Sequence, residues 1–267
     1  MKTSFSFTSI IPKSISPYHS EENGILIQGD SFEVMKQLTP ASIDMIFADP
    51  PYFLSNGGIS CHSGKMVSVD KGDWDKIDSL EEKHSFNRSW IKLCKRLLKD
   101  NGSLWISGSL HNIYSIGMAL EQEGFAILNN ITWQKTNPPP NLSCRYFTHS
   151  TETILWACKA EHKSKHIFNY EIMKELNGGK QMKDVWTSSL TPPSEKLEGK
   201  HPTQKPLFLL KQIILASTHV ENIVLDPFSG SSTTGVAAMG LNRKYIGIEL
   251  KKEYLDLSVR RITKKET

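Results

Sequence analysis

The sequence is poor in cysteine and in long apolar runs, and both shortages narrow the class of protein. None of its four cysteines lies in a CxxC pair, and a chain of 267 residues is not a small disulfide-bonded scaffold. We therefore expect free thiols in a reducing compartment at Cys61, Cys94, Cys144 and Cys158. No apolar run is long enough for a signal peptide or a membrane span, which predicts a cytoplasmic protein.

The sequence also lacks a strong excess of charge, a metal-ligand pattern and a dinucleotide fingerprint. The net charge of +4 is compatible with a polyanionic partner but is too small to establish one. The spacing of His149, His162 and His166 is not that of metal ligands, so we expect no metal. A GxGxxG motif after a strand is absent, which argues against a nicotinamide-dependent dehydrogenase.

Short apolar runs alternate with amphipathic stretches along the whole chain, and this alternation is typical of α/β proteins. Several runs are almost continuously apolar, as strands covered on both faces tend to be. A capping box at Ser79 and Glu82 predicts the start of a helix, and Gly102 and Gly124 fall where helices would end. The sequence therefore predicts a doubly wound, mostly parallel sheet, with strands at 25–27, 43–48, 103–107, 127–133, 153–159, 222–226 and 245–249.

Two segments interrupt this alternation. Residues 53–73 are rich in Gly and Ser, and a loop of that length inside a compact domain is usually functional. Residues 136–200 contain TNPPPN, several basic residues and little periodicity, which predicts an inserted module.

The stretch VLDPFSGSSTTGVAAMG at 224–240 predicts a strand, a Gly/Ser/Thr turn and an Ala-rich helix. Such a turn brings backbone N–H groups close to a ligand, and Glu249 at the tip of the next strand could accept ribose hydroxyls. Asp226 would repel a phosphate but suits an ammonium, and Phe228 offers an apolar face. These features favour S-adenosylmethionine, although Asp226 could instead cap the turn and Phe228 could be a core residue.

The stretch DPPY at 49–52 follows the predicted strand 43–48. If that strand lies beside 222–226 in a parallel sheet, both loops emerge at the edge where open α/β sheets bind ligands. Asp49 and the Pro50 carbonyl could then accept the two N–H groups of an exocyclic base amine, and Tyr52 could stack on an extruded base. Proline stiffens the loop, although Asp-Pro-Pro is also a common turn.

Both motifs, in this order, resemble the permuted β class of amino-group DNA methyltransferases, over residues 24–262. Within that class, LHNIYSIGMALEQEGF and GKQMKDVWTSSL are most similar to the accessory adenine-N6 methyltransferases of DpnII-type restriction-modification systems, which act on GATC. HinfI- and CcrM-like enzymes, which act on GANTC, are also similar.

The resemblance implies a Rossmann-like methyltransferase fold with an inserted target-recognition region. The expected organisation is a catalytic half at 1–135, target recognition at 136–200 and a cofactor-binding half at 201–267, the two halves forming one catalytic domain. The implied catalytic residues are Asp49, Pro50, Pro51 and Tyr52. The implied cofactor-binding residues are Asp30, His201, Thr203, Lys205, Asp226, Phe228, Gly230, Ser231, Thr233, Thr234 and Glu249.

One position departs from the family pattern. The family usually has a second glycine where this chain has Ser232. A serine loses conformational freedom there unless the turn keeps a negative φ at that position.

The expected partner is DNA, contacted by residues 53–73 and 136–200. Within the second stretch, Lys159, Lys163 and Lys165 supply basic charge, and Arg145 is the preferred reader of guanine, unless it is a solvated surface residue. The other expected DNA contacts are Lys135 and Asn137. A cognate restriction endonuclease is implied as a functional partner, and a homodimer is compatible with the sequence.

Three other functions stay open on the sequence alone. Methylation of cytosine N4 uses the same chemistry, and Asp49 favours adenine without deciding between the two. A GANTC target would suit the similarity to HinfI. A DNA-binding protein without turnover would not need the intact Asp49, Asp226 and Glu249.

Overall fold

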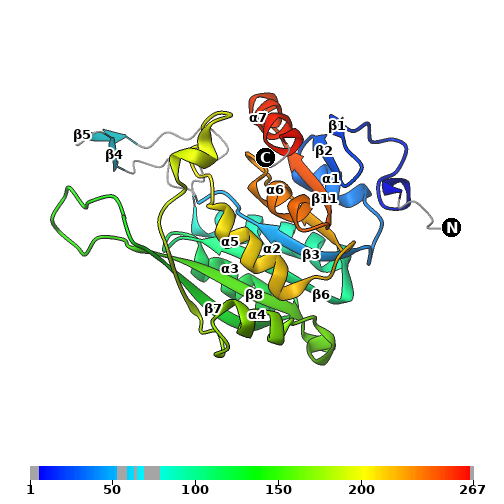
Figure 1. The fold of residues 1–267 in the computed structure, drawn as a ribbon, viewed down its shortest axis with the longest axis horizontal. Helices are drawn as coiled ribbons and strands as arrows, with labels where there is room; N and C mark the ends of the chain where they lie inside the picture. Colours follow the sequence, from blue (N-terminus) through cyan, green and yellow to red (C-terminus); the bar gives the residue numbers. More distant parts are fainter. Residues whose placement is uncertain (1–5, 53–58, 63–64, 69–78, 265–267) are drawn as a thin grey trace.

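The computed structural model describes residues 6–52, 59–62, 65–68 and 79–264 (Figure 1). Within them lies a mixed sheet of nine strands in the order β1-β2-β11-β10-β3-β6-β8-β7-β9. Its strands are β1 (His19–Ser20), β2 (Gly24–Gln28), β3 (Ile43–Ala48), β6 (Leu98–Gly108), β7 (Phe125–Lys135), β8 (Thr151–Lys159), β9 (Val185–Ser188), β10 (Ile223–Asp226) and β11 (Lys244–Glu249). A separate antiparallel pair joins β4 (Ile59–His62) to β5 (Lys65–Ser68).

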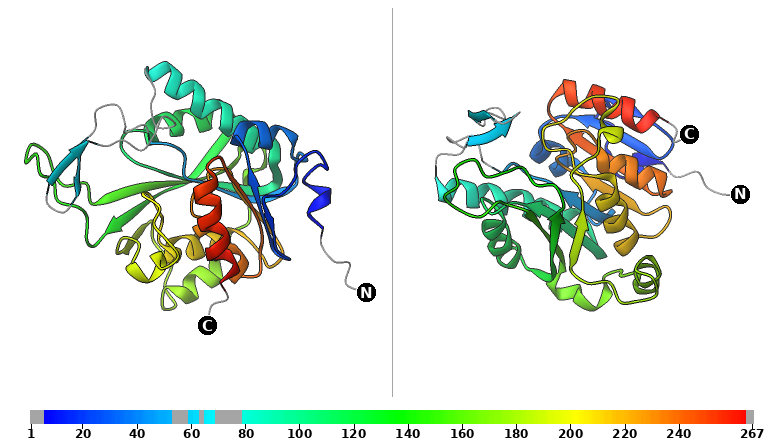
Figure 2. Two further views of the ribbon diagram at one scale, coloured as in Figure 1. Left: turned by 90° about the horizontal axis from the view of Figure 1, so that it is seen from above. Right: turned by 60° about the vertical axis from the view of Figure 1, so that its left-hand side comes forward.

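Helices cover both faces of the sheet, which Figure 2 shows with the molecule seen from above. One face packs on α1 (Ser31–Gln37), α2 (Leu80–Leu97) and α3 (Ile113–Gln122). The other face packs on α4 (Tyr170–Leu176), α5 (Leu207–Ser217), α6 (Thr233–Gly240) and α7 (Lys252–Thr263). The described residues also form three short 3-10 helices, η1 (Phe7–Ser9), η3 (Ala160–Lys165) and η4 (Pro193–Lys196). The predicted doubly wound fold is confirmed.

The two strands that were expected to carry the functional loops are neighbours. β10 pairs with β3 in parallel, with Val224 opposite Met45 and Leu225 opposite Ile46. All six residues of β3 are buried, because helices cover both faces. The carboxyl ends of β3 and β10 therefore open at one edge, directly before Asp49 and Pro227.

The helix start expected at Ser79 is confirmed, since the Ser79 hydroxyl accepts from the backbone N–H of Glu82 at 3.0 Å and α2 begins at the next residue. The helix end expected at Gly102 is wrong: α2 ends at Leu97, and Gly102 lies within β6. A Cβ at Gly102 would lie 2.8 Å from the carbonyl oxygen of Asp44, so the glycine allows β6 to approach β3 closely.

The stretch 136–200, which was expected to form an inserted module, contributes two strands to the main sheet. β8 lies between β6 and β7, and it runs antiparallel to both. β9, which has four residues and which the sequence did not predict, pairs with β7 at one edge of the sheet. Within this stretch, residues 136–150 and 189–200 leave the sheet at the same strand ends as Asp49, the carboxyl end of β3.

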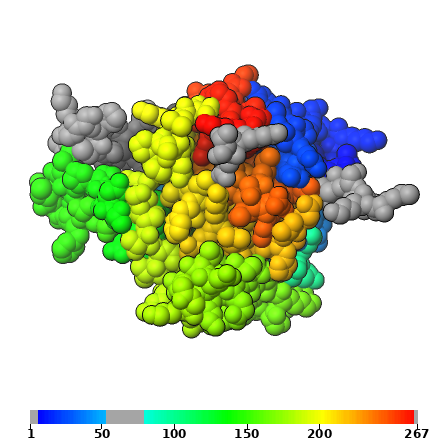
Figure 3. Space-filling model, viewed as in Figure 1, coloured from blue at the N-terminus to red at the C-terminus, as the bar shows by residue number. Residues whose placement is uncertain are grey.

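The antiparallel direction of β8 separates the two ends of that stretch. Gly108 pairs with Thr153 at the Asp49 edge, whereas Ser103 pairs with Cys158 further toward the opposite edge. η3, with Lys163 and Lys165, therefore follows β8 at the edge far from Asp49, and Figure 3 shows the segment around 136–150 (green) well apart from that following β8. Lys163 and Lys165 therefore lie at the opposite ends of the strands from Asp49, and Lys159 is the last residue of β8.

Two further expectations concern cysteines and membranes. Cys94 and Cys158 are buried free thiols and Cys144 is an exposed one, while the side chain of Cys61 lies outside the described residues. Among the residues that the structure covers, no helix combines the length and apolarity needed to cross a bilayer.

Candidate active site

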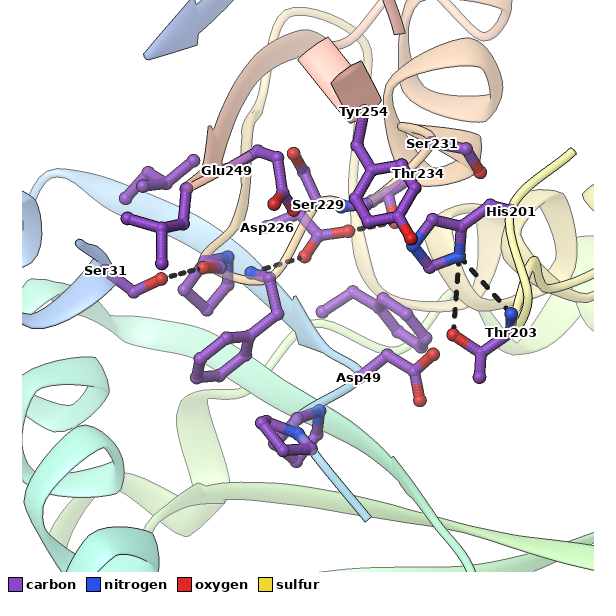
Figure 4. A pocket seen from close by; sticks show the side chains of 18 of the residues that line it. Ser31, Asp49, His201, Thr203, Asp226, Ser229, Ser231, Thr234, Glu249 and Tyr254 are labelled. Carbon is purple, nitrogen blue, oxygen red and sulfur yellow. Dashed lines mark hydrogen bonds between the residues drawn. The ribbon is translucent and has the colours of Figure 1, made fainter. Parts of the chain in front are cut away.

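A cavity of about 290 Å³ opens at the carboxyl ends of β3, β10 and β11. Each of the fifteen residues that the sequence assigned to catalysis or cofactor binding lines it, and Figure 4 shows several of these side chains around the cavity. The strand argument placed 49–52, 226–234 and Glu249 together. The segments at 30–32 and 201–205 reach the same cavity from the two faces of the sheet.

The turn after β10 is held by its own acid. The Asp226 carboxylate accepts from the Phe228 backbone N–H at 3.0 Å and from the Thr234 hydroxyl. Burial raises the pKa of this carboxyl to about 7, against those two hydrogen bonds. Asp226 thus caps the turn, as the plainer interpretation held, and also lines the cavity.

Glu249, at the end of β11, likewise both binds backbone N–H groups and lines the cavity. Its two carboxylate oxygens each accept from a backbone N–H at 2.9 Å, one from Gly230 and one from Lys251. Burial raises its pKa, with those backbone groups acting in the opposite direction. Because each carboxylate oxygen has a second lone pair, Glu249 can still accept a ligand hydroxyl.

The turn after β10 is tight and is held by contacts from outside its own segment. Gly230 has φ +50, and a Cβ there would lie 3.1 Å from the His201 ring. Ser232 adopts φ +53, so the negative-φ interpretation is wrong, and its hydroxyl lies 3.2 Å from that of Tyr245. The buried Arg261, which the sequence reading missed, donates to the hydroxyls of Ser231 and Thr233 at 2.9 Å each.

Aromatic rings make one wall of the cavity apolar. Phe228 packs edge-on against Trp90, with centroids 5.7 Å apart, and Phe32 packs edge-on against Phe86 at 5.3 Å. Phe32 and Phe86 line the cavity but were not predicted to, since nothing local distinguishes them from core residues. Asp30 caps α1 by accepting from the Phe32 N–H at 2.9 Å and also lines the cavity.

The cavity fits S-adenosylmethionine on the residues that are present. An apolar wall suits the adenine, Glu249 can accept ribose hydroxyls, and Asp226 provides a carboxylate for an ammonium. The His201 ring, which lies beside Gly230, packs edge-on against the Tyr254 ring, with centroids 4.3 Å apart. Its Nδ1 lies 3.3 Å from the Thr203 backbone nitrogen. Tyr254 was not predicted.

The side chains of Asp49 and Tyr52 belong to a buried ionic network. The Tyr52 hydroxyl donates to Asp49 Oδ1 at 2.7 Å and lies 3.4 Å from Glu152 Oε2. Lys205, which was expected to line the methionine end of the cofactor, directs its ammonium to Asp49 Oδ2 at 2.6 Å and to the Tyr52 hydroxyl at 3.0 Å. Burial raises the pKa of Asp49, and the Lys205 ammonium only partly opposes this.

A second cavity, of about 810 Å³, adjoins the first. Tyr52, Lys205, Thr203 and Gln204 line both, so the ionic network lies between them. The second cavity is otherwise lined by β7, β8, the start of α3 with the exposed Tyr114, and the segment 136–150 with the exposed Tyr146.

The three residues expected to contact DNA differ in their surroundings. Arg145 lies exposed on the projecting segment 136–150. The Lys135 ammonium is bonded to Glu152 at 2.7 Å, and the Asn137 side-chain oxygen accepts from the Leu190 N–H at 2.9 Å. The loop expected at 53–73 lies outside the described residues except for β4 and β5.

Comparisons with known proteins agree with this geometry. The family model described as DNA methylase (N6_N4_Mtase) matches residues 43–260. The type II methyltransferase M2.DpnII of Streptococcus pneumoniae is 67% identical over 246 residues, which are 92% of each chain. The type II methyltransferase M.HinfI of Haemophilus influenzae is 44% identical, over 89% of this chain and 67% of that one.

Two solved structures share the fold. The crystal structure of an M1.HpyAVI–SAM complex has a TM-score of 0.65 and 29% identity, and the match covers 90% of this chain and 100% of that one. PvuII DNA methyltransferase, described as cytosine-N4-specific, has a TM-score of 0.73 at 21% identity, with 95% and 91% coverage. The second likeness concerns the fold alone.

Proposed function

The chain belongs to the DNA methylase family, and from that premise we propose that it methylates the N6 amine of adenine in DNA, using S-adenosylmethionine. The observation that carries this proposal is that the DPPY segment and the turn after β10 line one cavity. The resemblance to DpnII-type methyltransferases is confirmed by the relatives.

Bound S-adenosylmethionine supplies an electrophilic methyl group, and the protein has to present a nitrogen to it. The lone pair of an exocyclic amine is delocalised into its ring, which makes it a poor nucleophile. Asp49 accepts one N–H of the amine and the Pro50 carbonyl accepts the other, which favours a pyramidal nitrogen whose lone pair is available. The stiff Pro-Pro segment keeps these acceptors in place before the base arrives.

Tyr52 supports this arrangement from the side of the second cavity. Its side chain is only 8% exposed, and its hydroxyl is bonded to Asp49, so the ring is held in one orientation. An extruded base that enters from the second cavity meets this ring. After the methyl transfer, the nitrogen carries positive charge, and its proton can pass to the Asp49 carboxylate, whose pKa burial raises.

We further propose that the target is GATC and that a restriction endonuclease with the same site is the functional partner. The resemblance to DpnII-type enzymes supports this target. Segments 136–150 and 189–200, which flank the second cavity, are the candidates for target recognition. GANTC is the second candidate, because M.HinfI is also similar over most of this chain.

A direct test is to incubate the purified protein with tritiated S-adenosylmethionine and plasmid DNA, and then to identify the labelled nucleoside and its sequence context. The expected product is N6-methyladenine, with the plasmid protected against a nuclease that GATC methylation blocks. Recovery of N4-methylcytosine would refute the adenine assignment, and continued cleavage at GATC despite methyl transfer would refute the target.

A further inference from the structure

Two lysines and two carboxylates meet between the two cavities. The Lys205 ammonium lies 2.6 Å from Asp49 Oδ2 and 3.7 Å from Glu152 Oε2. The Lys135 ammonium lies 2.7 Å from Glu152 Oε1. Glu152 is thus shared between both lysines, although it lies 103 positions along the chain from Asp49 and was not predicted as a site residue.

The side chains of these four residues are largely buried. The exposed fractions of the side chains are 7% for Lys205, 14% for Asp49, 11% for Lys135 and 16% for Glu152. An unpaired charge in such surroundings is strongly destabilising, so none of the four can lose its partner unless another partner is within reach. The positions of the charges in this group are therefore coupled.

This coupling matters because Asp49 is already engaged on both oxygens. Its Oδ1 accepts from the Tyr52 hydroxyl and its Oδ2 accepts from the Lys205 ammonium. A charged ammonium is a stronger donor than the N–H of a neutral base amine. The second lone pair of Oδ2 can accept from the target amine, but the amine binds more strongly once the ammonium withdraws. The carboxylate toward which the ammonium can move is Glu152.

We propose that Glu152 is a positioning residue for methyl transfer, which draws the Lys205 ammonium away from Asp49 when the target amine enters. The proposal rests on the proposed function of the Asp49 site. A movement of about 1 Å would bring the ammonium from 3.7 Å to hydrogen-bonding distance of Glu152 Oε2. Glu152 would then pair with both ammonium groups, through one oxygen each, and Asp49 Oδ2 would accept from the substrate.

The protonation of the group supports this role. Burial alone would raise the pKa of Glu152, but the ammonium groups of Lys205 and Lys135 outweigh it, and the pKa of Glu152 is lowered. For Lys205, burial acts to lower the pKa, and the two carboxylates raise it above its ordinary value. Glu152 and Lys205 are therefore both ionised at neutral pH.

The pH dependence of turnover distinguishes this role from a structural one. The titratable groups that act on Asp49 are Lys205, Glu152 and Tyr52, and Asp226 is coupled to Asp49 by charge. Activity requires ionised Asp49, so the acidic limb of the pH–rate profile follows its pKa. Loss of a nearby negative charge should move this limb to lower pH, and loss of a nearby positive charge should move it to higher pH.

The experiment is single-turnover methylation of a DNA duplex across pH, with S-adenosylmethionine and DNA binding measured alongside. Glu152→Gln should lower the plateau rate by roughly 10- to 100-fold, because the ammonium stays on Asp49. Its acidic limb should move down by about one pH unit, whereas Lys205→Met should move the limb up by roughly 1–3 units. Glu152→Asp, which keeps the charge, should fall between the wild type and Glu152→Gln.

Glu123→Gln is the matched control, because Glu123 is also a glutamate with a nearly buried side chain, 12% exposed, and it is paired with Arg88 far from the site. This variant should keep both the plateau and the limb. An unchanged plateau in Glu152→Gln would overturn the proposal, and so would limbs that move in the same direction in both site variants. Failure of the wild type to methylate adenine would instead refute the proposed function.

Discussion

The side-chain amide of Asn112 donates a hydrogen bond to the Pro51 carbonyl at 2.9 Å. Asn112 is itself held by Asn87, whose amide donates to its side-chain oxygen at 2.7 Å. Both asparagines are buried, 1% and 0% exposed, on the α2–α3 side of the sheet. A pair of helix-side amides therefore anchors the backbone of the DPPY segment from outside the cavity.

Asn112→Ala should disturb that anchor without touching the cofactor. It removes the Asn112 partner of the Pro51 carbonyl and one of the two acceptors of the Asn87 amide, which should lower the free energy of unfolding by roughly 1–3 kcal/mol. Because the Asp49 and Pro50 acceptors would shift, turnover should fall by about tenfold or more. S-adenosylmethionine affinity, measured by calorimetry, should not change.

Asn169→Ala provides the comparison for that variant. The Asn169 amide donates to the carbonyls of Leu215 and Thr218 at 2.7 and 2.8 Å, away from the site. This variant should lose similar stability but keep wild-type turnover. If both variants lose turnover equally, the Asn112 effect is general destabilisation and not positioning.

The binding of S-adenosylmethionine should depend on pH through Asp226. Since burial raises the pKa of this carboxyl to about 7, the cofactor-free protein holds it mostly protonated under acidic conditions. An ammonium favours the ionised form, so affinity should rise by close to tenfold per pH unit from about pH 5.5 toward 7. Isothermal titration across this range measures the slope, and Asp226→Asn should bind weakly with little pH dependence.

The stability of the cofactor-free fold should change with pH in the opposite direction to the cofactor affinity. A carboxyl with a raised pKa in the folded state stabilises the fold below its unfolded pKa, near 4, and that contribution disappears as the pH rises through about 7. The Tm of the cofactor-free wild type should therefore decrease over this range more than that of Asp226→Asn. His201 also lines the cavity, so His201→Gln serves as control and should retain most of the affinity slope. A slope lost in His201→Gln and kept in Asp226→Asn would contradict the assignment.

The strands and both loop motifs could be predicted because their signals are local. β3 matches its prediction residue for residue, since continuous apolar sequence is characteristic of a strand covered on both faces. The motifs were placed together by one argument about parallel strands, and the pairing of β3 with β10 confirms it.

What sequence reasoning missed depends on pairs that are distant along the chain. Lys205 was assigned to the cofactor from its neighbours in sequence, but its ammonium is bonded to Asp49, 156 positions away. Asn112, Glu152 and Arg261 act through similarly remote partners, and each resembles an ordinary polar residue in its own segment. The sequence could not show that Lys163 and Lys165 lie at the opposite strand ends from Asp49, because the direction of β8 could not be inferred from its composition.

Recognition of the target should depend on the projecting segment 136–150. Arg145 is its exposed arginine, and a guanidinium can donate two hydrogen bonds to guanine in the major groove. Arg145→Ala should reduce the preference for GATC over a substituted site by roughly 1–3 kcal/mol, measured as the ratio of methylation rates on two duplexes.

Lys163→Ala is the control for this variant, because η3 lies at the opposite edge of the sheet and the substitution should leave the preference unchanged. Equal preference in Arg145→Ala and in the wild type would show that Arg145 is a solvated surface residue.

Asp49 should carry the chemistry rather than the fold or the binding. It follows the last residue of β3 and lines the cavity, and its proposed hydrogen bond from the target amine strengthens as positive charge develops on the nitrogen. Loss of the carboxylate should therefore reduce turnover, by about 10²–10³ for a preorganised contact of this kind. Asp49→Ala leaves Lys205 with Glu152 as a partner, so the variant should fold, bind DNA and keep its thermal shift with S-adenosylmethionine.

Two further variants separate the role of the Asp49 side chain from that of its strand. Asp49→Asn should retain more activity than Asp49→Ala, because its amide oxygen can still accept a hydrogen bond. Asp44 is a buried aspartate on the same strand, bonded to Lys99 and to the Ile223 N–H at 2.8 Å each. Asp44→Asn should thus lower stability while turnover stays near wild type. If Asp49→Ala methylates DNA at the wild-type rate, the DPPY segment is only a turn, and the amine is presented by other groups.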